Sequence, residues 1–141
     1  MTVAATTPLL LANLHAECFT FPRPWVAGEF ADLLNSQTCF LCQEDFGLLL
    51  GRVVAGEAEL LTLAVSPQTR RQGIAQRLMR AFLQEAGSRN AESAFLEVAE
   101  TNVAAISLYT KNGFLQQSRR KGYYRHPDGQ TEDALIMVRH F

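Results

Sequence analysis

Apolar residues recur along the chain at two spacings, and each spacing predicts a kind of secondary structure. Within residues 73–87 they occupy every third or fourth position, as on the buried face of an amphipathic helix: Ile74, Leu78, Phe82 and Ala86. Residues 60–65 and 94–99 are apolar almost throughout, which is typical of strands covered on both faces. This part of the chain is therefore predicted to run strand, helix, strand.

Caps and turns predict the remaining elements. Thr7 suits the start of a first helix that ends near Cys18, whereas a second helix around residues 30–34 lacks a good capping residue. A further helix at residues 103–111 is capped by Asn102. The other expected strands lie at residues 38–43, 46–55, 57–65, 114–124 and 132–138.

This order of elements predicts an α+β fold. It is an α/β/α sandwich in which helices cover both faces of a mixed, mostly antiparallel central sheet of about six or seven strands. The strands at residues 57–65 and 94–99 should be parallel, because the long helix between them makes a crossover connection. The sequence has no repeat, linker or low-complexity tract, so residues 1–141 are expected to form one domain.

Composition and charge exclude several classes of protein. Apolar residues make up 48% of the chain and charged residues 19%, which indicates a globular rather than a disordered protein. The formal net charge of −1 gives no basic field, so no direct nucleic-acid partner is expected. No apolar run is long enough to span a bilayer and no signal peptide is recognised, so a cytoplasmic protein without membrane contact is expected.

The three cysteines, Cys18, Cys39 and Cys42, are expected to be free thiols, because their number is odd and no export signal precedes them. Cys39 and Cys42 have the spacing of a zinc or redox pair. They fall, however, in a predicted strand, where positions three apart point to opposite faces. We therefore expect two buried thiols there, and no metal.

The segment from Arg70 to Ala75 joins an apolar strand to the long helix and carries candidate chemistry. Backbone N–H groups at a helix start lack internal partners, and the helix dipole places partial positive charge there. Gly73 lets the main chain approach a ligand, and Arg70 and Arg71 add positive charge, which together suit a phosphate or pyrophosphate. From these residues alone a plain strand–loop–helix junction with two solvated arginines fits equally well, and the pattern is neither a P-loop nor a dinucleotide fingerprint.

Motifs in sequence order resemble one known family. They are Arg70-x-x-Gly73-x-Ala75 after Leu63-Ala64-Val65, Leu96-Glu97-Val98 with Asn102, Leu108-Tyr109 with Asn112-Gly113-Phe114, and Arg119-Arg120-Lys121-Gly122-Tyr123-Tyr124. Together they resemble the GCN5-related N-acetyltransferases, and within that family the branch that acetylates the N-terminal alanine of a small-subunit ribosomal protein. Ala75 holds the last small position of the loop, where the family accepts alanine in place of glycine, and Ser66 stands where relatives often carry aspartate.

The resemblance implies acetyl-CoA as cosubstrate, bound where two parallel central strands splay apart in a V. The pantetheine arm would pair with the main chain of Leu63, Ala64 and Val65, and Asn102 would contact the arm as well as cap its helix. The pyrophosphate would sit beside Arg70 on the N–H groups of Arg71, Gln72, Gly73, Ile74 and Ala75.

The resemblance also implies a base and an acid. Glu97 would take a proton from the attacking amine, directly or through water, and a carboxylate in an apolar strand is expected to have a raised pKa. Its alternative interpretation is a strand-end carboxylate that pairs with an arginine, and Glu100 is the second candidate for the base. Tyr109 would protonate the CoA thiolate, a transfer from a phenol of pKa about 10 to a thiol of about 8.5. By spacing alone, Tyr109 is a core aromatic of its helix.

Four aromatic residues are expected to wall the channel for the acceptor: Phe21 and Trp25 on one side, Tyr123 and Tyr124 on the other. The arginines beside the tyrosines are otherwise a solvated strand face. The resemblance implies a monomeric N-terminal protein acetyltransferase whose partner is a protein N-terminus, that of a ribosomal protein. Two alternatives stay open, namely the same fold acting on a small-molecule amine or lysine side chain, and a CoA-binding module without turnover.

Overall fold

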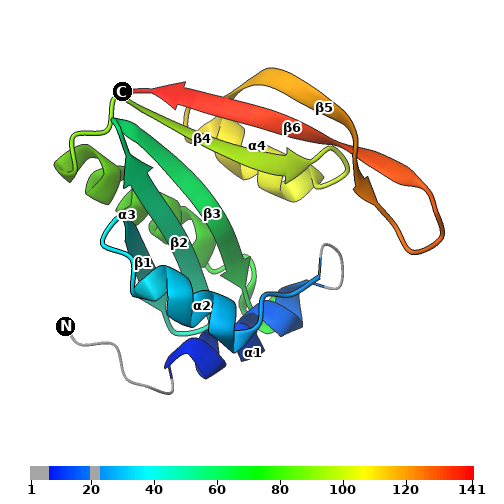
Figure 1. Cartoon of the computed structure of the whole chain (residues 1–141), viewed down its shortest axis with the longest axis horizontal. Helices are drawn as coiled ribbons and strands as arrows, with labels where there is room; N and C mark the ends of the chain where they lie inside the picture. The colour runs from blue at the N-terminus through cyan, green and yellow to red at the C-terminus, as the bar shows by residue number, and fades with distance from the viewer. Residues whose placement is uncertain (1–6, 20–22) are drawn as a thin grey trace. The chain divides into compact units, whose positions relative to one another are not determined.

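The computed structural model describes residues 7–19 and 23–141, and Figure 1 shows the course of the chain. The helices are α1 (Thr7–Cys18), α2 (Ala27–Leu34), α3 (Ile74–Ser88) and α4 (Val103–Lys111), with the 3-10 turn η1 (Pro67–Thr69). The strands are β1 (Cys39–Glu44), β2 (Gly47–Val54), β3 (Glu57–Val65), β4 (Ser93–Ala99), β5 (Leu115–Arg125) and β6 (Thr131–His140). Each predicted helix and strand is present, and its boundaries differ from the prediction by a few residues at most.

In the described part of the chain, six strands form one sheet in the order β1-β2-β3-β4-β6-β5. β1 with β2, β4 with β6, and β5 with β6 are antiparallel. β3 and β4 run parallel, with Glu57 opposite Ser93. The predicted α+β fold with a mixed, mostly antiparallel sheet is therefore confirmed, and so is the parallel pair that the crossover through α3 requires.

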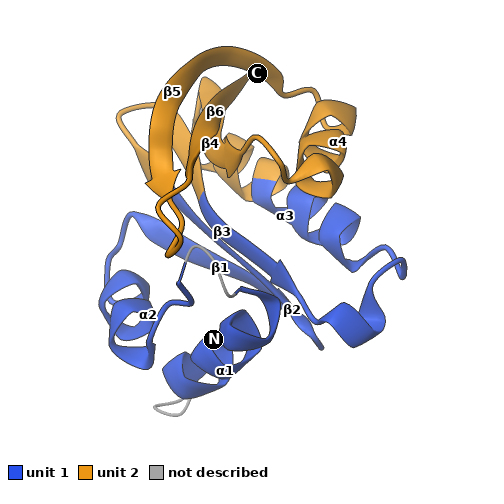
Figure 2. Cartoon of the chain, turned by 90° about the vertical axis from the view of Figure 1, so that its right-hand side faces the viewer, with its two compact units in different colours: residues 1–52, 61–82 blue, residues 53–60, 83–141 orange. Residues whose placement is uncertain are grey.

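The chain folds into two compact units, which are described separately below and coloured in Figure 2. Unit 1 comprises residues 1–52 and 61–82, and unit 2 comprises residues 53–60 and 83–141. β3 and α3 each contribute residues to both units. The predicted splay between β3 and β4 concerns residues of both units and stays a prediction, as does the expectation of a single domain.

On one face of β2, unit 1 has an apolar core built by both N-terminal helices. Leu48 of β2 clusters with Leu11 of α1, Phe30 of α2 and Ala64 of β3, and all four side chains are buried. Each of the two helices thus contributes one fully buried apolar side chain to the core against the strands, Leu11 from α1 and Phe30 from α2.

On the opposite face of β2, two glycines let α3 come close. A Cβ added at Gly47 would lie 2.6 Å from Cγ2 of Ile74, and one at Gly51 would lie 2.7 Å from Cζ of Phe40. The ring of Phe40 stacks on that of Phe82 with the centroids 5.8 Å apart. Successive strand residues point to opposite faces, so helices cover both faces of the sheet within unit 1.

α2 begins without a capping side chain at Val26, and a residue inside the helix supplies the missing acceptor. Oε1 of Glu29 accepts the N–H of Val26 at 3.1 Å. Arg23 donates to the same carboxylate at 2.7 Å and lowers the pKa of Glu29. The start that the sequence left weakly supported is therefore held by one glutamate.

His15 of α1 is buried, with 2% of its surface exposed, among aromatic rings of unit 1. Its Nδ1 accepts the N–H of Trp25 at 3.1 Å, so Nε2 carries the proton and donates to Oγ1 of Thr62 at 2.8 Å. The imidazole also stacks on Phe19 and Trp25, with centroids 4.3 and 5.5 Å away. Burial lowers the pKa of His15 to about 4, although the charge of Glu29 opposes the shift.

Lowering the pH from 7 to 5 is expected to remove about 2 kcal/mol from the free energy of unfolding through His15. The unfolded imidazole binds a proton below its ordinary pKa of 6.5, whereas the folded one stays neutral down to about 4. The contribution is therefore full above pH 6.5 and is lost as the pH falls toward 4. Urea unfolding at several pH values measures it. His15→Gln should flatten the dependence and His140→Gln, at an exposed position, should not; a wild-type dependence in His15→Gln would contradict the assignment.

Unit 2 is built around β4 and β6, whose alternate side chains are buried. Leu96 of β4 and Met137 of β6 lie opposite each other and are both buried. α4 begins at Asn102, whose Oδ1 accepts the N–H of Ala105 at 3.2 Å, so the predicted cap is confirmed. Tyr109 of α4 packs edge-on against the buried ring of Phe114, which anchors the helix.

Candidate active site

The predicted pyrophosphate loop lies in unit 1, between η1 and α3, and its residues 70–73 are exposed. Arg71 and Gly73 have positive φ angles of 70° and 78°. Such left-handed turns occur in the backbone concavities that bind anions. Gly73 also accepts the N–H of Arg77 at 3.0 Å, so the first turn of α3 begins directly at the loop. An exposed, positively charged loop that opens a helix fits a pyrophosphate.

Arg77 of α3 fixes this loop, and no pattern in the sequence indicates this role. Its Nη1 donates to the carbonyl of Gln72 at 3.0 Å. Its Nε and Nη2 donate to the two carboxylate oxygens of Glu44 at 2.8 and 2.7 Å. Glu44 lies 33 positions away in sequence, so no local pattern could have paired it with Arg77.

The end of β3 carries the main chain predicted to pair with pantetheine. Ala64 is buried, while Leu63 and Val65 are partly exposed. The Sγ of Cys18 donates to the carbonyl of Val65 at 3.1 Å, a contact that sequence reasoning missed. Burial raises the pKa of the Cys18 thiol, and the charge of Arg70 opposes that shift. Arg70 therefore lies near the end of α1 as well as in the loop.

Of the four aromatic residues predicted to wall the acceptor channel, Phe21 lies outside the described residues. Trp25 belongs to unit 1, where its ring lies 5.3 Å from that of Phe30. Tyr123 and Tyr124 belong to unit 2 and form an edge-on pair with ring centroids 5.1 Å apart.

Glu97, the predicted base, lies near the end of β4 and is partly exposed. Its Oε1 is 3.5 Å from Nη2 of Arg120 on β5. The pairing with an arginine, which was the alternative interpretation of this residue, is therefore present in the structure. Arg120 also lies over the ring of Tyr123, 5.3 Å from its centroid, so it joins the predicted base to the predicted acceptor wall.

Tyr109, the predicted acid, lies in the same unit as Glu97, and Tyr124 interacts electrostatically with both residues. Burial raises the pKa of Tyr109 to about 12, and Tyr124 adds to the shift. Burial also raises the pKa of Tyr124, and the negative charge of Glu97 raises it further. Unit 2 thus brings together the predicted base, the predicted acid and one wall of the acceptor channel. The expectation of an ordinary phenol pKa for Tyr109 is wrong, because its hydroxyl is buried.

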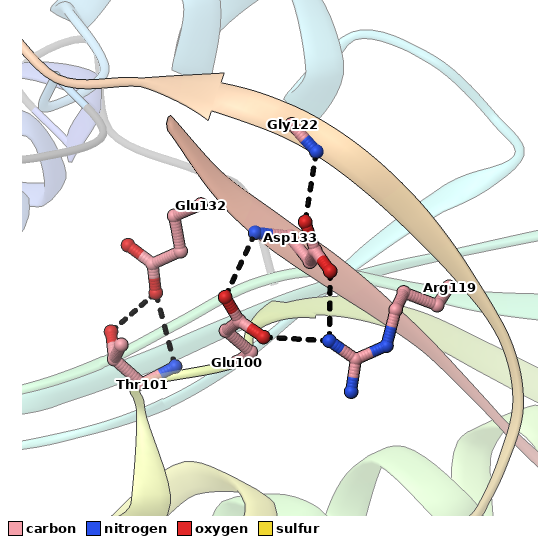
Figure 3. A network of polar contacts seen from close by, with 6 residues as sticks. All are labelled: Glu100, Thr101, Arg119, Gly122, Glu132 and Asp133. Atoms are coloured by element: carbon pink, nitrogen blue, oxygen red, sulfur yellow. Dashed lines mark hydrogen bonds and ion pairs between the residues drawn. The ribbon is translucent and has the colours of Figure 1, made fainter. Parts of the chain in front are cut away.

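Glu100, the second candidate for the base, has both carboxylate oxygens engaged (Figure 3). Oε2 accepts a hydrogen bond from Nη1 of Arg119 at 2.6 Å, and Oε1 accepts the N–H of Asp133 at 3.3 Å. A carboxylate held in this way has less freedom to reach an amine, which favours Glu97.

Glu132 of β6 is a buried carboxylate that sequence reasoning did not single out. It accepts the N–H of Thr101 at 3.0 Å and also the Thr101 hydroxyl (Figure 3). Its Oε2 lies 2.9 Å from Nε2 of His126. The hydrogen bond from Thr101 lowers the pKa of Glu132 against the opposing effect of burial. Glu132 therefore holds the turn between β4 and α4, immediately before Asn102.

Among residues 7–19 and 23–141, no group of three or more His, Cys, Asp or Glu side chains could hold a metal ion. None of Cys18, Cys39 and Cys42 forms a disulfide, and each is half-buried, whereas buried thiols were predicted at Cys39 and Cys42. None of the helices in these ranges combines the length and the apolar character needed to cross a bilayer.

Comparison with known proteins identifies the class. The sequence pattern of the acetyltransferase (GNAT) family matches residues 10–114, and the chain belongs to this family. It is thus an N-acetyltransferase of a family that uses acetyl-CoA, which confirms the resemblance found in the motifs.

Within this family, the chain is similar to enzymes named for one reaction. The chain is 41% identical to the [ribosomal protein bS18]-alanine N-acetyltransferase of Escherichia coli strain K12, over 92% of this chain and 89% of that protein. It is 42% identical to the enzyme of the same name from Haemophilus ducreyi, over 58% of this chain and 57% of that protein.

Solved structures share the fold. The crystal structure of the ribosomal-protein-S18-alanine N-acetyltransferase from Escherichia coli has a TM-score of 0.86 at 29% identity, covering 99% of this chain and 91% of that one. Arabidopsis thaliana NAA60 in complex with acetyl-CoA has a TM-score of 0.83 at 19% identity, covering 99% and 96%, and shows the fold alone.

Proposed function

We propose that the chain is a single-domain N-terminal protein acetyltransferase that moves an acetyl group from acetyl-CoA to the α-amine of ribosomal protein bS18, at its N-terminal alanine. The observation that carries the proposal is the 41% identity over nearly the whole length of the Escherichia coli enzyme of that name. The enzyme acts as a monomer in the cytoplasm.

Unit 1 supplies most of the cosubstrate-binding residues of the proposal, and unit 2 supplies Asn102. The pyrophosphate is held by the N–H groups of the loop at residues 71–75, which the positive φ angles of Arg71 and Gly73 support. The end of β3, at residues 63–65, offers main chain to the pantetheine arm. Acetyl-CoA supplies an acetyl group that is already activated as a thioester, so positioning and proton removal are the tasks left to the protein.

Unit 2 supplies the proton chemistry. An α-amine has a pKa of about 8, so roughly a tenth is neutral at pH 7, against well under a thousandth of a lysine amine. A carboxylate is therefore a sufficient base for a protein N-terminus, and Glu97 takes this role. The amine displaces Arg120 from Glu97, loses a proton to the carboxylate and attacks the thioester carbonyl directly.

Tyr109 assists the departing thiolate as a hydrogen-bond donor. Its pKa of about 12 keeps the phenol protonated throughout the working range. The same pKa makes complete transfer to a thiolate, whose conjugate acid has a pKa of about 8.5, unfavourable by about 5 kcal/mol. Donation of a hydrogen bond during bond breaking, with solvent protonating the thiolate later, avoids that cost.

The test is incubation with acetyl-CoA and three peptides that differ only in their first residue, Ala, Ser or Met. Acetylation of the α-amine, read by mass shift and thiol release and fastest for Ala, is expected. An Nα-blocked peptide containing lysine and a polyamine are the comparison acceptors. Acetylation of these alone would replace the proposal with a small-molecule or lysine acetyltransferase, and CoA binding without any product would make the chain a binding module.

Gly73→Ala is expected to raise the KM for acetyl-CoA about tenfold with little change in kcat. Alanine is strained at a φ of 78°, and its Cβ would lie 3.2 Å from Nη1 of Arg77. The matched control is Gly87→Ala in α3, where nothing lies within 4 Å of the added Cβ. That variant should keep the wild-type KM. Equal KM values for the two variants would remove the loop from the cosubstrate site.

A further inference from the structure

The pairing of β5 with β6 contains a bulge next to the predicted acceptor wall. Arg120 lies opposite Ala134, and the next recorded pair is Tyr124 opposite Glu132. Between these pairs β5 has residues 121–123, whereas β6 has Asp133 alone. Gly122, in the middle of the bulge, has a positive φ of 61°, a conformation that glycine adopts without strain.

Asp133 holds this bulge from the opposite strand (Figure 3). Its Oδ1 accepts the N–H of Gly122 at 2.9 Å, where regular pairing would supply a main-chain carbonyl. Its Oδ2 accepts a hydrogen bond from Nη1 of Arg119 at 2.8 Å. The hydrogen bond from Arg119 is the main cause of the lowered pKa of Asp133, and the bond from the Gly122 N–H is the next. The carboxylate therefore stays charged. Arg119 is oriented in turn by Glu100.

The bulge sets the position of Tyr124 without turning it to the other face. It adds two residues, an even number, so Arg120 and Tyr124 keep the same face of the sheet. Glu97 lies opposite Ile136, which shares a face of β6 with Ala134 and therefore with Tyr124. Without the bulge Tyr124 would lie opposite Gln130, the residue before β6 and about 7 Å beyond Glu132.

We propose that Asp133 is a positioning residue of the acceptor site: by capping the β5 bulge it sets the place of Tyr124 on the face of the sheet that carries Glu97. The inference rests on the proposed function. Asp133 lies on the other face of β6 from Glu132, beside Arg119, Lys121 and Glu100, so it acts through the main chain of Gly122 rather than on substrate.

Asp133→Ala is expected to raise the KM for the alanine peptide about tenfold and to leave the KM for acetyl-CoA unchanged. Asp133→Asn should stay within about threefold of wild type, because the amide oxygen still accepts the Gly122 N–H. The matched control is Asp128→Ala in the same hairpin. There the aspartate Oδ1 accepts the N–H of Gln130 at 2.9 Å, so this variant also removes one acceptor of a backbone N–H. It should keep both KM values. Equal effects of Asp133→Ala and Asp128→Ala would overturn the proposal.

A double-mutant cycle separates positioning from general stability. In a Tyr124→Ala background, Asp133→Ala should raise the KM for the alanine peptide by less than about twofold, because the side chain that Asp133 positions is gone. A full tenfold cost in that background would overturn the proposal. If Asp133→Ala does not fold, Arg119→Gln takes its place, with an expected rise of about threefold; no rise would equally count against it.

A readout independent of activity keeps this inference distinct from the proposed function. Hydrogen exchange at the N–H groups of Gly122, Tyr123 and Tyr124 should speed up in Asp133→Ala and change little in Asp133→Asn. If wild-type protein acetylates no peptide, the proposed function fails while exchange still tests the bulge. Unchanged exchange in Asp133→Ala would overturn the inference even with a fully active enzyme.

Discussion

Glu97→Gln is expected to lower kcat on the alanine peptide about a hundredfold at pH 7. Glutamine keeps the size of the side chain but cannot take up a proton. The α-amine must then lose its proton to solvent before it can attack. The loss should shrink as the pH rises through the amine pKa of about 8, because the substrate then deprotonates by itself. A pH–rate profile from pH 6 to 9.5 measures both effects.

Glu100→Gln is the informative comparison, since Glu100 is the second candidate and is already held by Arg119. It should lower activity much less than Glu97→Gln and should not change the shape of the pH–rate profile. An unaltered profile in Glu97→Gln, with the loss found instead in Glu100→Gln, would move the base to Glu100. If neither variant changes the profile, solvent takes the proton.

Tyr109→Phe is expected to lower kcat by about one to two orders of magnitude and to leave the KM for acetyl-CoA within about twofold of wild type. The substitution removes only the buried hydroxyl and keeps the ring that packs on Phe114. With a phenol pKa of about 12, the wild-type rate should show no loss from tyrosine ionisation below pH 10.

The matched control for this substitution is Thr110→Val, which removes a hydroxyl at the neighbouring, exposed position of α4. It should keep the wild-type kcat. Acetyl thioesters with more acidic thiols need less help on leaving, so the deficit of Tyr109→Phe should be smaller with such donors. A deficit that does not depend on the leaving thiol, or unchanged turnover, would remove Tyr109 from this role.

The parts of the fold that the sequence predicted well depend on contacts near in sequence. Asn102 caps α4 through an N–H three residues away, and the apolar stripe of α3 repeats every turn. The loop from Arg70 to Ala75 likewise depends on residues that are near one another in sequence. Such features leave a pattern in a single sequence because the chain itself sets the distance between the partners.

What the sequence could not show depends on strand order and on buried environments. Arg120 reaches Glu97 because β5 and β4 both flank β6, an order that no spacing encodes. The raised pKa of Tyr109 comes from burial that only tertiary packing creates. Asp133 and Glu132 are neighbours in sequence with different tasks, because successive strand residues point to opposite faces.

Gly47 of β2 makes the loop at the start of α3 sensitive to a remote substitution. Gly47 leaves no room for a methyl group beside Ile74, the first residue of α3. A methyl group there would clash with the side chain of Ile74, and we expect the start of α3 and the loop that precedes it to shift in response. Screens for variants with weakened affinity for acetyl-CoA should therefore recover substitutions at Gly47, a strand position without a side chain.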